Sequence, residues 1–150
     1  MPLSARQTIL EAFKACLQTI QRANGYQSDV GLRVFMGEVL VLGEDDPDEI
    51  AAVVVQEDEV RFVGKKLAVR LPVQLQAQAK ATLDEPWARV EAVIADIKTA
   101  VETENRDLGG RVRWQIGRES TRAMDRQEGS LIVGASITYV VPYGEAWGMP

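Results

Sequence analysis

Apolar residues recur at helical spacing in two segments, 4–23 and 86–103, which are therefore predicted to be amphipathic helices. Ser4 and Gln7 make a capping-box pattern at the start of the first segment, and Gly25 suits the left-handed residue that ends a helix. An acidic residue followed by proline marks the start of the second helix. The apolar stripe of that helix comprises Trp87, Val90, Ile94, Ile97 and Val101.

The strictest alternation of apolar and polar residues lies at 66–78 and predicts a long, half-buried strand. Its apolar positions are Leu67, Val69, Leu71, Val73, Leu75 and Ala77. Pro72 lacks the N–H that a strand donates to its neighbour, so we expect the strand to lie at a sheet edge or to be bulged at that point. A long edge strand is a natural docking place for another subunit.

Shorter runs rich in β-branched residues predict the remaining strands. Besides 66–78, the expected strands lie at 31–35, 50–56, 112–117 and 131–141, with a hairpin at 38–42, a loop at 118–130 and an irregular tail at 144–150. Helices that are apolar on one stripe need a sheet to cover it, and strands in hairpin-like succession favour antiparallel pairing. The expected fold is a single α+β domain, with a mainly antiparallel or mixed sheet of about five strands flanked by two helices in the order α-β-β-β-α-β-β.

Length and composition agree with one globular core, because the chain has 150 residues, of which 46% are hydrophobic and 26% charged. The chain shows no membrane-length apolar run and no signal-peptide pattern, so we expect synthesis in a cytoplasm and no membrane partner. Cys16, the single cysteine, lies on the apolar stripe of the first helix and is expected to be buried. Histidine is absent, which removes the Ser-His-Asp and Cys-His arrangements and the commonest zinc ligand. We therefore expect no enzyme, no cofactor and no metal centre.

An acidic stretch without Lys or Arg runs from Glu38 to Glu59. Its spacing does not match the calcium-loop pattern and Pro47 interrupts it, so a solvated loop is favoured over a metal site. Nothing in the pattern marks one of its carboxylates as desolvated. The candidate interface residues in this stretch are Glu44, Asp45, Asp46 and Asp48.

Arginine is concentrated later in the chain, where the candidate interface residues are Arg111, Arg113, Arg118, Arg122 and Arg126. The planar guanidinium suits carboxylates and phosphates, so this segment is expected to face nucleic acid or an acidic partner, with a solvated hairpin as the plain alternative. A net charge of -5 and a pI near 4.8 argue against general nucleic-acid binding. Because acidic and basic segments are separated, we hypothesise that copies pack head-to-tail, a contact that makes a ring if it closes.

The C-terminal residues Y-G-E-A-W-G-M-P place Trp147 in the expected irregular tail. An exposed indole there favours a partner surface, and folding back onto the core is the equally open alternative. The loop before the last strand contains Ser120 and Thr121 but no base that would activate a hydroxyl.

Several segments together resemble a known family. The first helix ends in A-N-G-Y-Q-S-D-V-G, a strand pair and a long alternating strand follow, the second helix contains A-D-I-K-T-A, and R-Q-E-G-S precedes a strand ending in Y-V-V-P-Y-G. Over Leu10 to Gly144 the chain resembles the tail-terminator proteins of long-tailed bacteriophages and prophages. The shared motifs are architectural, and they include no catalytic residue.

This resemblance implies a structural virion protein of the tail. Such a subunit forms a hexameric ring at the head-proximal end of the tail tube, stops tube polymerisation and offers an attachment surface to the neck or connector proteins. DNA passes through the lumen without specific binding, and the protein is in the host cytoplasm during assembly. The alternatives are another head-tail joining protein, such as a neck stopper or tail-completion factor, a small ligand-binding domain or enzyme, and local nucleic-acid binding through the arginine segment.

Overall fold

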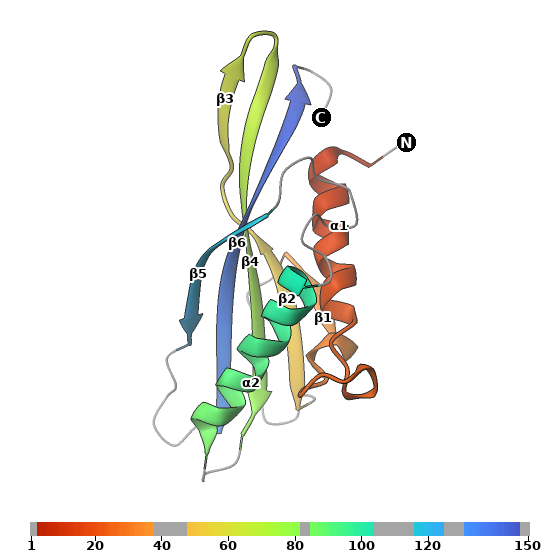
Figure 1. Ribbon diagram of the computed structural model, residues 1–150, viewed down its shortest axis with the longest axis vertical. Helices are drawn as coiled ribbons and strands as arrows, with labels where there is room; N and C mark the ends of the chain where they lie inside the picture. Colours follow the sequence, from red (N-terminus) through yellow and green to blue (C-terminus); the bar gives the residue numbers. More distant parts are fainter. Residues whose placement is uncertain (1–2, 38–47, 82–84, 104–115, 125–130, 148–150) are drawn as a thin grey trace.

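The first helix, α1 (Ala5–Gln18), begins as the sequence predicts and ends earlier. The computed structural model describes residues 3–37, 48–81, 85–103, 116–124 and 131–147 (Figure 1). The capping box at the helix start is confirmed: the Gln7 N–H donates to the Ser4 hydroxyl oxygen at 3.1 Å, and the Ser4 N–H donates to the Gln7 side-chain oxygen at 3.2 Å. The predicted helix end at residue 23 is wrong, because the helix stops at Thr19 and a separate 3₁₀ turn, Arg22–Asn24, follows. Gly25, at φ 92°, ends that turn in the left-handed conformation.

Gly31 explains why the first strand begins later than predicted. It lies in a second 3₁₀ turn, Val30–Leu32, which packs so closely on the end of α1 that a Cβ atom on Gly31 would approach the Leu17 carbonyl oxygen to 2.3 Å. Strand β1 (Val34–Met36) therefore starts only after this turn. It pairs in parallel with β2 (Glu49–Val55), with Val34 opposite Ala51. The hairpin expected at 38–42 lies outside the described residues.

The long alternating strand is confirmed as β4 (Lys66–Lys80), but its expected edge position is wrong. It is a central strand, paired on one side with β6 (Ile132–Ala146) along its whole length and on the other side with β2 and then with β3 (Glu59–Val63). Strand β3 was not predicted; the acidic residues before it hid a short run in which Val60 and Phe62 alternate with Glu59 and Arg61. The described residues thus form a six-stranded sheet in the order β1-β2-β4-β6-β5, with β3 beside β4.

Pro72 is tolerated in this central strand because it lies between two partners. Pairing with β2 ends at Val73 and pairing with β3 begins at Arg70, so Pro72 falls in the gap. Its carbonyl oxygen accepts the N–H of Gln56 on that same side of the strand. A residue's N–H and C=O point to the same side of a strand, so the missing donor faces the gap and the ladder with β6 loses nothing.

The C-terminal third also differs from expectation. Strand β5 (Gly117–Ala123) occupies the first part of the segment expected to be a loop at 118–130, and it pairs antiparallel with β6. The predicted strand at 112–117 lies largely outside the described residues. β6 is confirmed and continues to Ala146, so residues 144–146 belong to a strand and not to an irregular tail.

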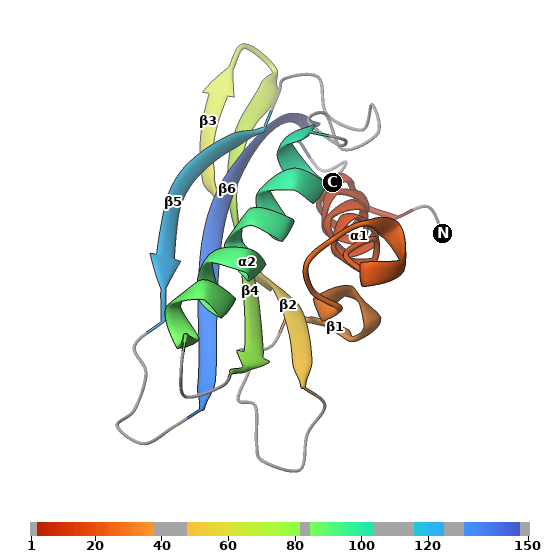
Figure 2. The same cartoon turned by 60° about the horizontal axis from the view of Figure 1, so that its bottom comes forward.

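The second helix, α2 (Pro86–Lys98), begins at the predicted proline, and a π-helical turn, Thr99–Thr103, carries it to the predicted end. Its apolar stripe is buried from Val93 onward, whereas Trp87, which was expected on that stripe, is 68% exposed. Both helices lie on one face of the sheet (Figure 2). Their apolar side chains share one core with the alternate residues of β2, β4 and β6. Phe13 of α1, Leu71 of β4 and Ile137 of β6 belong to this core. The α+β class with a mixed sheet and two helices is therefore confirmed.

Candidate assembly surfaces

Three strands extend beyond the helices as an arm, which we define as residues 59–69 and 143–147 (Figure 1). It consists of β3, the first part of β4 and the end of β6, in which Phe62 pairs with Leu67 and Leu67 pairs with Glu145. Gly64, at φ 65°, makes the turn at its tip. Among the described strands, β3 pairs only with β4, so its outer edge presents unpaired backbone donors and acceptors.

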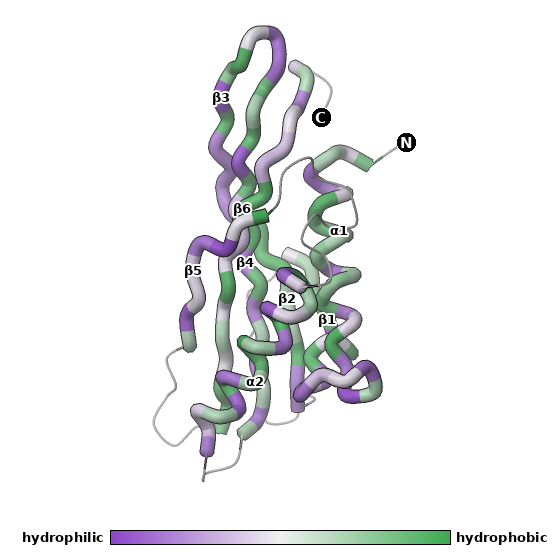
Figure 3. The backbone as a smooth tube through the Cα atoms, in the orientation of Figure 1, coloured by the Kyte–Doolittle hydropathy of each residue, from purple (hydrophilic) through white to green (hydrophobic). Residues whose placement is uncertain are grey.

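Two aromatic side chains lie together on one face of the arm. The ring centroids of Phe62 and Trp147 are 5.8 Å apart, and the side chains are 66% and 74% exposed. Val60 is exposed and lies two residues from Phe62 on the same strand face, and Figure 3 shows hydrophobic residues alternating with hydrophilic ones along the arm. Trp147 is thus not folded back onto the core. Apolar groups of this size in water are typical of surfaces that meet a partner.

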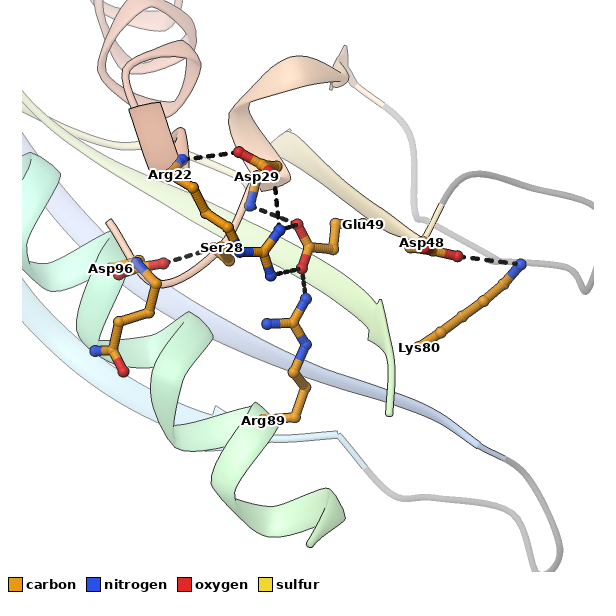
Figure 4. Close-up of polar contacts among 9 residues, drawn as sticks. Arg22, Ser28, Asp29, Asp48, Glu49, Lys80, Arg89 and Asp96 are labelled. Atoms are coloured by element: carbon orange, nitrogen blue, oxygen red, sulfur yellow. Dashed lines mark hydrogen bonds and ion pairs between the residues drawn. The ribbon is translucent and has the colours of Figure 1, made fainter. Parts of the chain in front are cut away.

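An ion-pair cluster around the buried Glu49 lies near the other end of the sheet and joins three parts of the chain (Figure 4). Glu49, at the start of β2, has a side chain only 5% exposed, and it accepts from Arg22 of the first 3₁₀ turn at 2.8 Å and from Arg89 of α2. The backbone N–H of Asp29 also donates to Glu49. Asp29 in turn accepts the backbone N–H of Arg22 at 2.8 Å and its guanidinium at 2.6 Å.

Two pKa shifts follow from this geometry. The backbone N–H and guanidinium of Arg22 hold the pKa of Asp29 below its usual value, although partial burial opposes them. Burial and the nearby positive charge of Arg22 lower the pKa of Arg89. The ion pairs of the cluster join two guanidinium groups to two carboxylates. The cluster therefore holds the segment after α1 against β2 and α2.

Asp96 gives the same segment a second anchor on α2. Its carboxylate, which is buried, accepts the hydroxyl of Ser28 at 2.5 Å and the backbone N–H of Gln27 at 3.0 Å. Both buried carboxylates, Glu49 and Asp96, are thus engaged in holding the 22–33 segment in place. In the described part of the chain, no group of three or more His, Cys, Asp or Glu residues is placed to hold a metal ion.

A cleft of about 800 Å³ opens beside the ion-pair cluster. Charged residues of both signs line it together with a few apolar ones: Arg22, Asp29, Leu32, Arg33, Asp48, Glu49, Lys80, Ala81, Glu85, Ala88, Arg89 and Ala92. Leu32, Ala88 and Ala92 give it an apolar part, Arg22 and Arg89 of the ion-pair cluster form part of its inner surface, and Glu85 is exposed at its rim. The exposed Trp87 lies in the first turn of α2 next to this rim.

Few of the candidate interface residues from the sequence are described, and those few lie apart. Arg118 and Arg122 are exposed on β5, which forms one edge of the sheet. Arg118 lies 3.5 Å from Glu102, which also accepts the hydroxyl of Tyr139 at 2.9 Å. Burial and this carboxylate raise the pKa of Tyr139.

Asp48 lies beside β2, toward the opposite edge of the sheet from β5, and its exposed carboxylate is 3.9 Å from the ammonium of Lys80. Asp48 and Arg118 each lie beside an opposite charge of their own chain. The others, Glu44, Asp45, Asp46, Arg111, Arg113 and Arg126, lie outside the described residues.

Sequence reasoning missed two features that matter most. Glu49 was grouped with the solvated acidic stretch, yet it is desolvated, because its arginine partners come from positions 22 and 89. The β-branched run that follows Glu49 was the available signal, since a carboxylate at the start of a buried strand is placed to be buried with it. The arm was missed because β3 was missed.

Neither a protein-family model nor a curated protein matches this chain. No helix in the described ranges is long and apolar enough to cross a membrane.

Proposed function

We propose that this chain is a structural subunit of a long-tailed bacteriophage or prophage particle. It forms a ring, hexameric by the resemblance, at the head-proximal end of the tail tube, stops tube polymerisation and provides the attachment surface for the neck. Its partners are copies of itself, the tail tube protein and the neck or connector proteins. The chain acts by assembly and not by catalysis.

The observation that carries this proposal is the arm. A rigid sheet extension with an open edge and an exposed aromatic pair offers backbone hydrogen bonds and apolar area to another protein. Burying a Phe or Trp side chain completely contributes roughly 1.5–3 kcal/mol, so one such contact is modest. Several contacts in one ring act together, because each later contact is intramolecular and gains from a high effective concentration.

Electrostatics supports a ring through which DNA passes without being held. The net charge of -5 gives the duplex no general attraction to the protein. The buried carboxylates Glu49 and Asp96 support an architectural role, because each is engaged by hydrogen bonds or ion pairs that hold chain segments together. Termination is then geometric: the ring covers the end of the tube and presents a different surface to the neck.

The test is electron microscopy of particles produced when the gene is deleted from the element that carries it. Tails that are overlong and lack heads are the expected result. Tails of normal length lying free would instead assign the chain to a neck-joining role. Normal infectious particles would refute the virion function altogether.

Complementation sharpens this test with a matched pair of variants. Phe62→Ser removes an exposed aromatic from the face of the arm that carries the Phe62–Trp147 pair. Val63→Ser changes a residue of similar exposure on the opposite face of the same strand. We expect Val63→Ser to restore normal tails and Phe62→Ser to leave a majority of tails overlong. Equal rescue by both would show that the arm does not carry the function.

A further inference from the structure

The arm and the cleft lie at opposite ends of the molecule. Strand β4 connects them, with Lys66 in the arm and Lys80 at the end near the cleft. Fifteen residues of strand at 3.3 Å per step place the two roughly 45 Å apart. The arm therefore cannot reach the cleft of its own molecule, and any contact between the two surfaces joins different molecules.

The two surfaces are complementary in kind. The arm presents Phe62 and Trp147 side by side, and the cleft presents an apolar wall at Leu32 and guanidinium groups at Arg22 and Arg89. Aromatic faces bind apolar walls through buried area and bind guanidinium groups through cation–π attraction. A volume of about 800 Å³ falls within the range of cavities that take drug-sized ligands, and two aromatic side chains belong to that size class.

Charge complementarity sets the orientation of the contact. Lys65 lies exposed at the tip of the arm, and Glu85 lies exposed at the rim of the cleft. Neither side chain forms an ion pair with another described residue of its own chain. An exposed pair of this kind adds little affinity by itself, but it selects one register between two docked surfaces.

We propose that the Phe62–Trp147 pair of one copy docks in the cleft of a second copy, over Arg22 and Arg89, with Lys65 facing Glu85. The contact is heterologous: each copy uses its arm on one neighbour and its cleft on the other, so successive contacts propagate and close into a ring when the angle permits. The inference rests on the proposed function, because it names the contact that joins neighbouring subunits of the ring.

The first experiment measures self-association of the purified full chain by sedimentation velocity up to millimolar concentration. We expect replacement of Phe62 and Trp147 by Ser to weaken association at least about tenfold, as loss of central aromatic anchors does at interfaces. Val63→Ser, the matched control, should change it by less than about twofold. Far-UV circular dichroism and urea unfolding verify that each variant is folded. A wild-type chain that stays monomeric at millimolar concentration overturns the inference.

The second experiment tests the direction of the contact by mixing. Ala88→Trp fills the cleft, so a cleft-blocked copy keeps a working arm, while the arm variant keeps a working cleft. A heterologous contact predicts that each variant alone is monomeric and that an equimolar mixture forms dimers and nothing larger. A mixture that stays monomeric, or either variant associating like wild type, overturns the proposal.

The third experiment uses charge exchange. Lys65→Glu and Glu85→Lys are each expected to weaken association by about fivefold, and the double variant is expected to return to within about twofold of wild type. Additive losses in the double variant would show that the two residues do not meet.

The outcomes separate this inference from the proposed function. Suppose that the wild-type chain forms rings and that deletion of the gene gives overlong tails, but that the arm variants associate like wild type. This result would retain the terminator function and reject the arm contact. Confirmed arm-to-cleft association together with normal particles on deletion would retain the contact and reject the function.

Discussion

Glu49 is the residue whose replacement tests the ion-pair cluster most directly. Glu49→Gln keeps the shape of the side chain but removes the charge and turns one acceptor oxygen into a donor. The carboxylate is 5% exposed and is contacted by Arg22, Arg89 and the N–H of Asp29, so the variant leaves two guanidinium groups without their shared anion.

The loss of folding stability in Glu49→Gln depends on how well water can replace the carboxylate beside each arginine. Removing one member of a buried ion pair typically costs about 3–5 kcal/mol. Arg22 is half exposed and is rehydrated easily, whereas the Arg89 side chain is only 21% exposed and is not. We therefore expect a loss at the lower end of that range, about 3 kcal/mol, which corresponds to about 10 °C in Tm for a chain of this size.

The assay is urea unfolding followed by circular dichroism at one fixed protein concentration, with Glu59→Gln as the matched control. Glu59 also faces an arginine, Arg70 at 3.8 Å, but its side chain is 73% exposed, so its loss should cost less than about 0.5 kcal/mol. An unchanged m value shows that the difference in midpoint reports stability. If Glu49→Gln destabilised the chain no more than Glu59→Gln, the cluster would not hold the fold in the way described.

Three further predictions concern backbone fit, charge and pH. Gly31→Ala should destabilise by about 3 kcal/mol because its Cβ meets backbone oxygen, while Gly144→Ala, with open space around it, should stay within about 0.5 kcal/mol in the same unfolding assay. Reversing Arg118 and Arg122 to Glu should weaken self-association several-fold at low salt and have no effect at high salt; an unchanged low-salt sedimentation profile would refute a contribution from that edge. The pKa of Asp29 is lower in the folded chain than its unfolded value of 3.8, so its ionised carboxylate stabilises the fold above pH about 4. This stabilisation is lost as the pH falls through the folded pKa. The urea midpoint of Asp29→Asn should therefore fall less than that of wild type between about pH 5 and pH 2.

Periodic patterns predicted those parts of the fold that bury one continuous face. The capping box at Ser4, the proline at the start of α2 and the alternation along β4 each contain their signal within a few residues, and each is found in the structure. The position of β4 in the sheet did not follow from the same pattern. Alternation reports which side chains share a face, and Pro72 predicts an edge or a bulge, whereas in the structure it lies at the gap between β2 and β3.

The candidate site was harder to predict because its partners are distant in sequence. Glu49 lies next to a run of acidic residues, and only the folded chain brings Arg22 and Arg89 to it. β3 was missed because its alternation spans only five residues, directly after acidic ones, and all five are exposed. Trp87 shows the reverse error, since its spacing places it on the apolar stripe but its side chain, in the first turn of α2, is 68% exposed.

The aromatic pair of the arm has a structural role that must be separated from a docking role. Phe62 lies opposite Leu67 in register, and Leu67 is only 7% exposed, so the Phe62 ring is placed to shield Leu67 from water. That role requires only the inner surface of the ring. Two thirds or more of Phe62 and Trp147 still face solvent, which is more apolar area than shielding needs and is unfavourable for an isolated chain. If Phe62 only shields Leu67, Phe62→Ser lowers the urea midpoint of the monomer. If Phe62 docks on another copy, Phe62→Ser lowers the association constant. Measuring both quantities on the same variant separates the two roles.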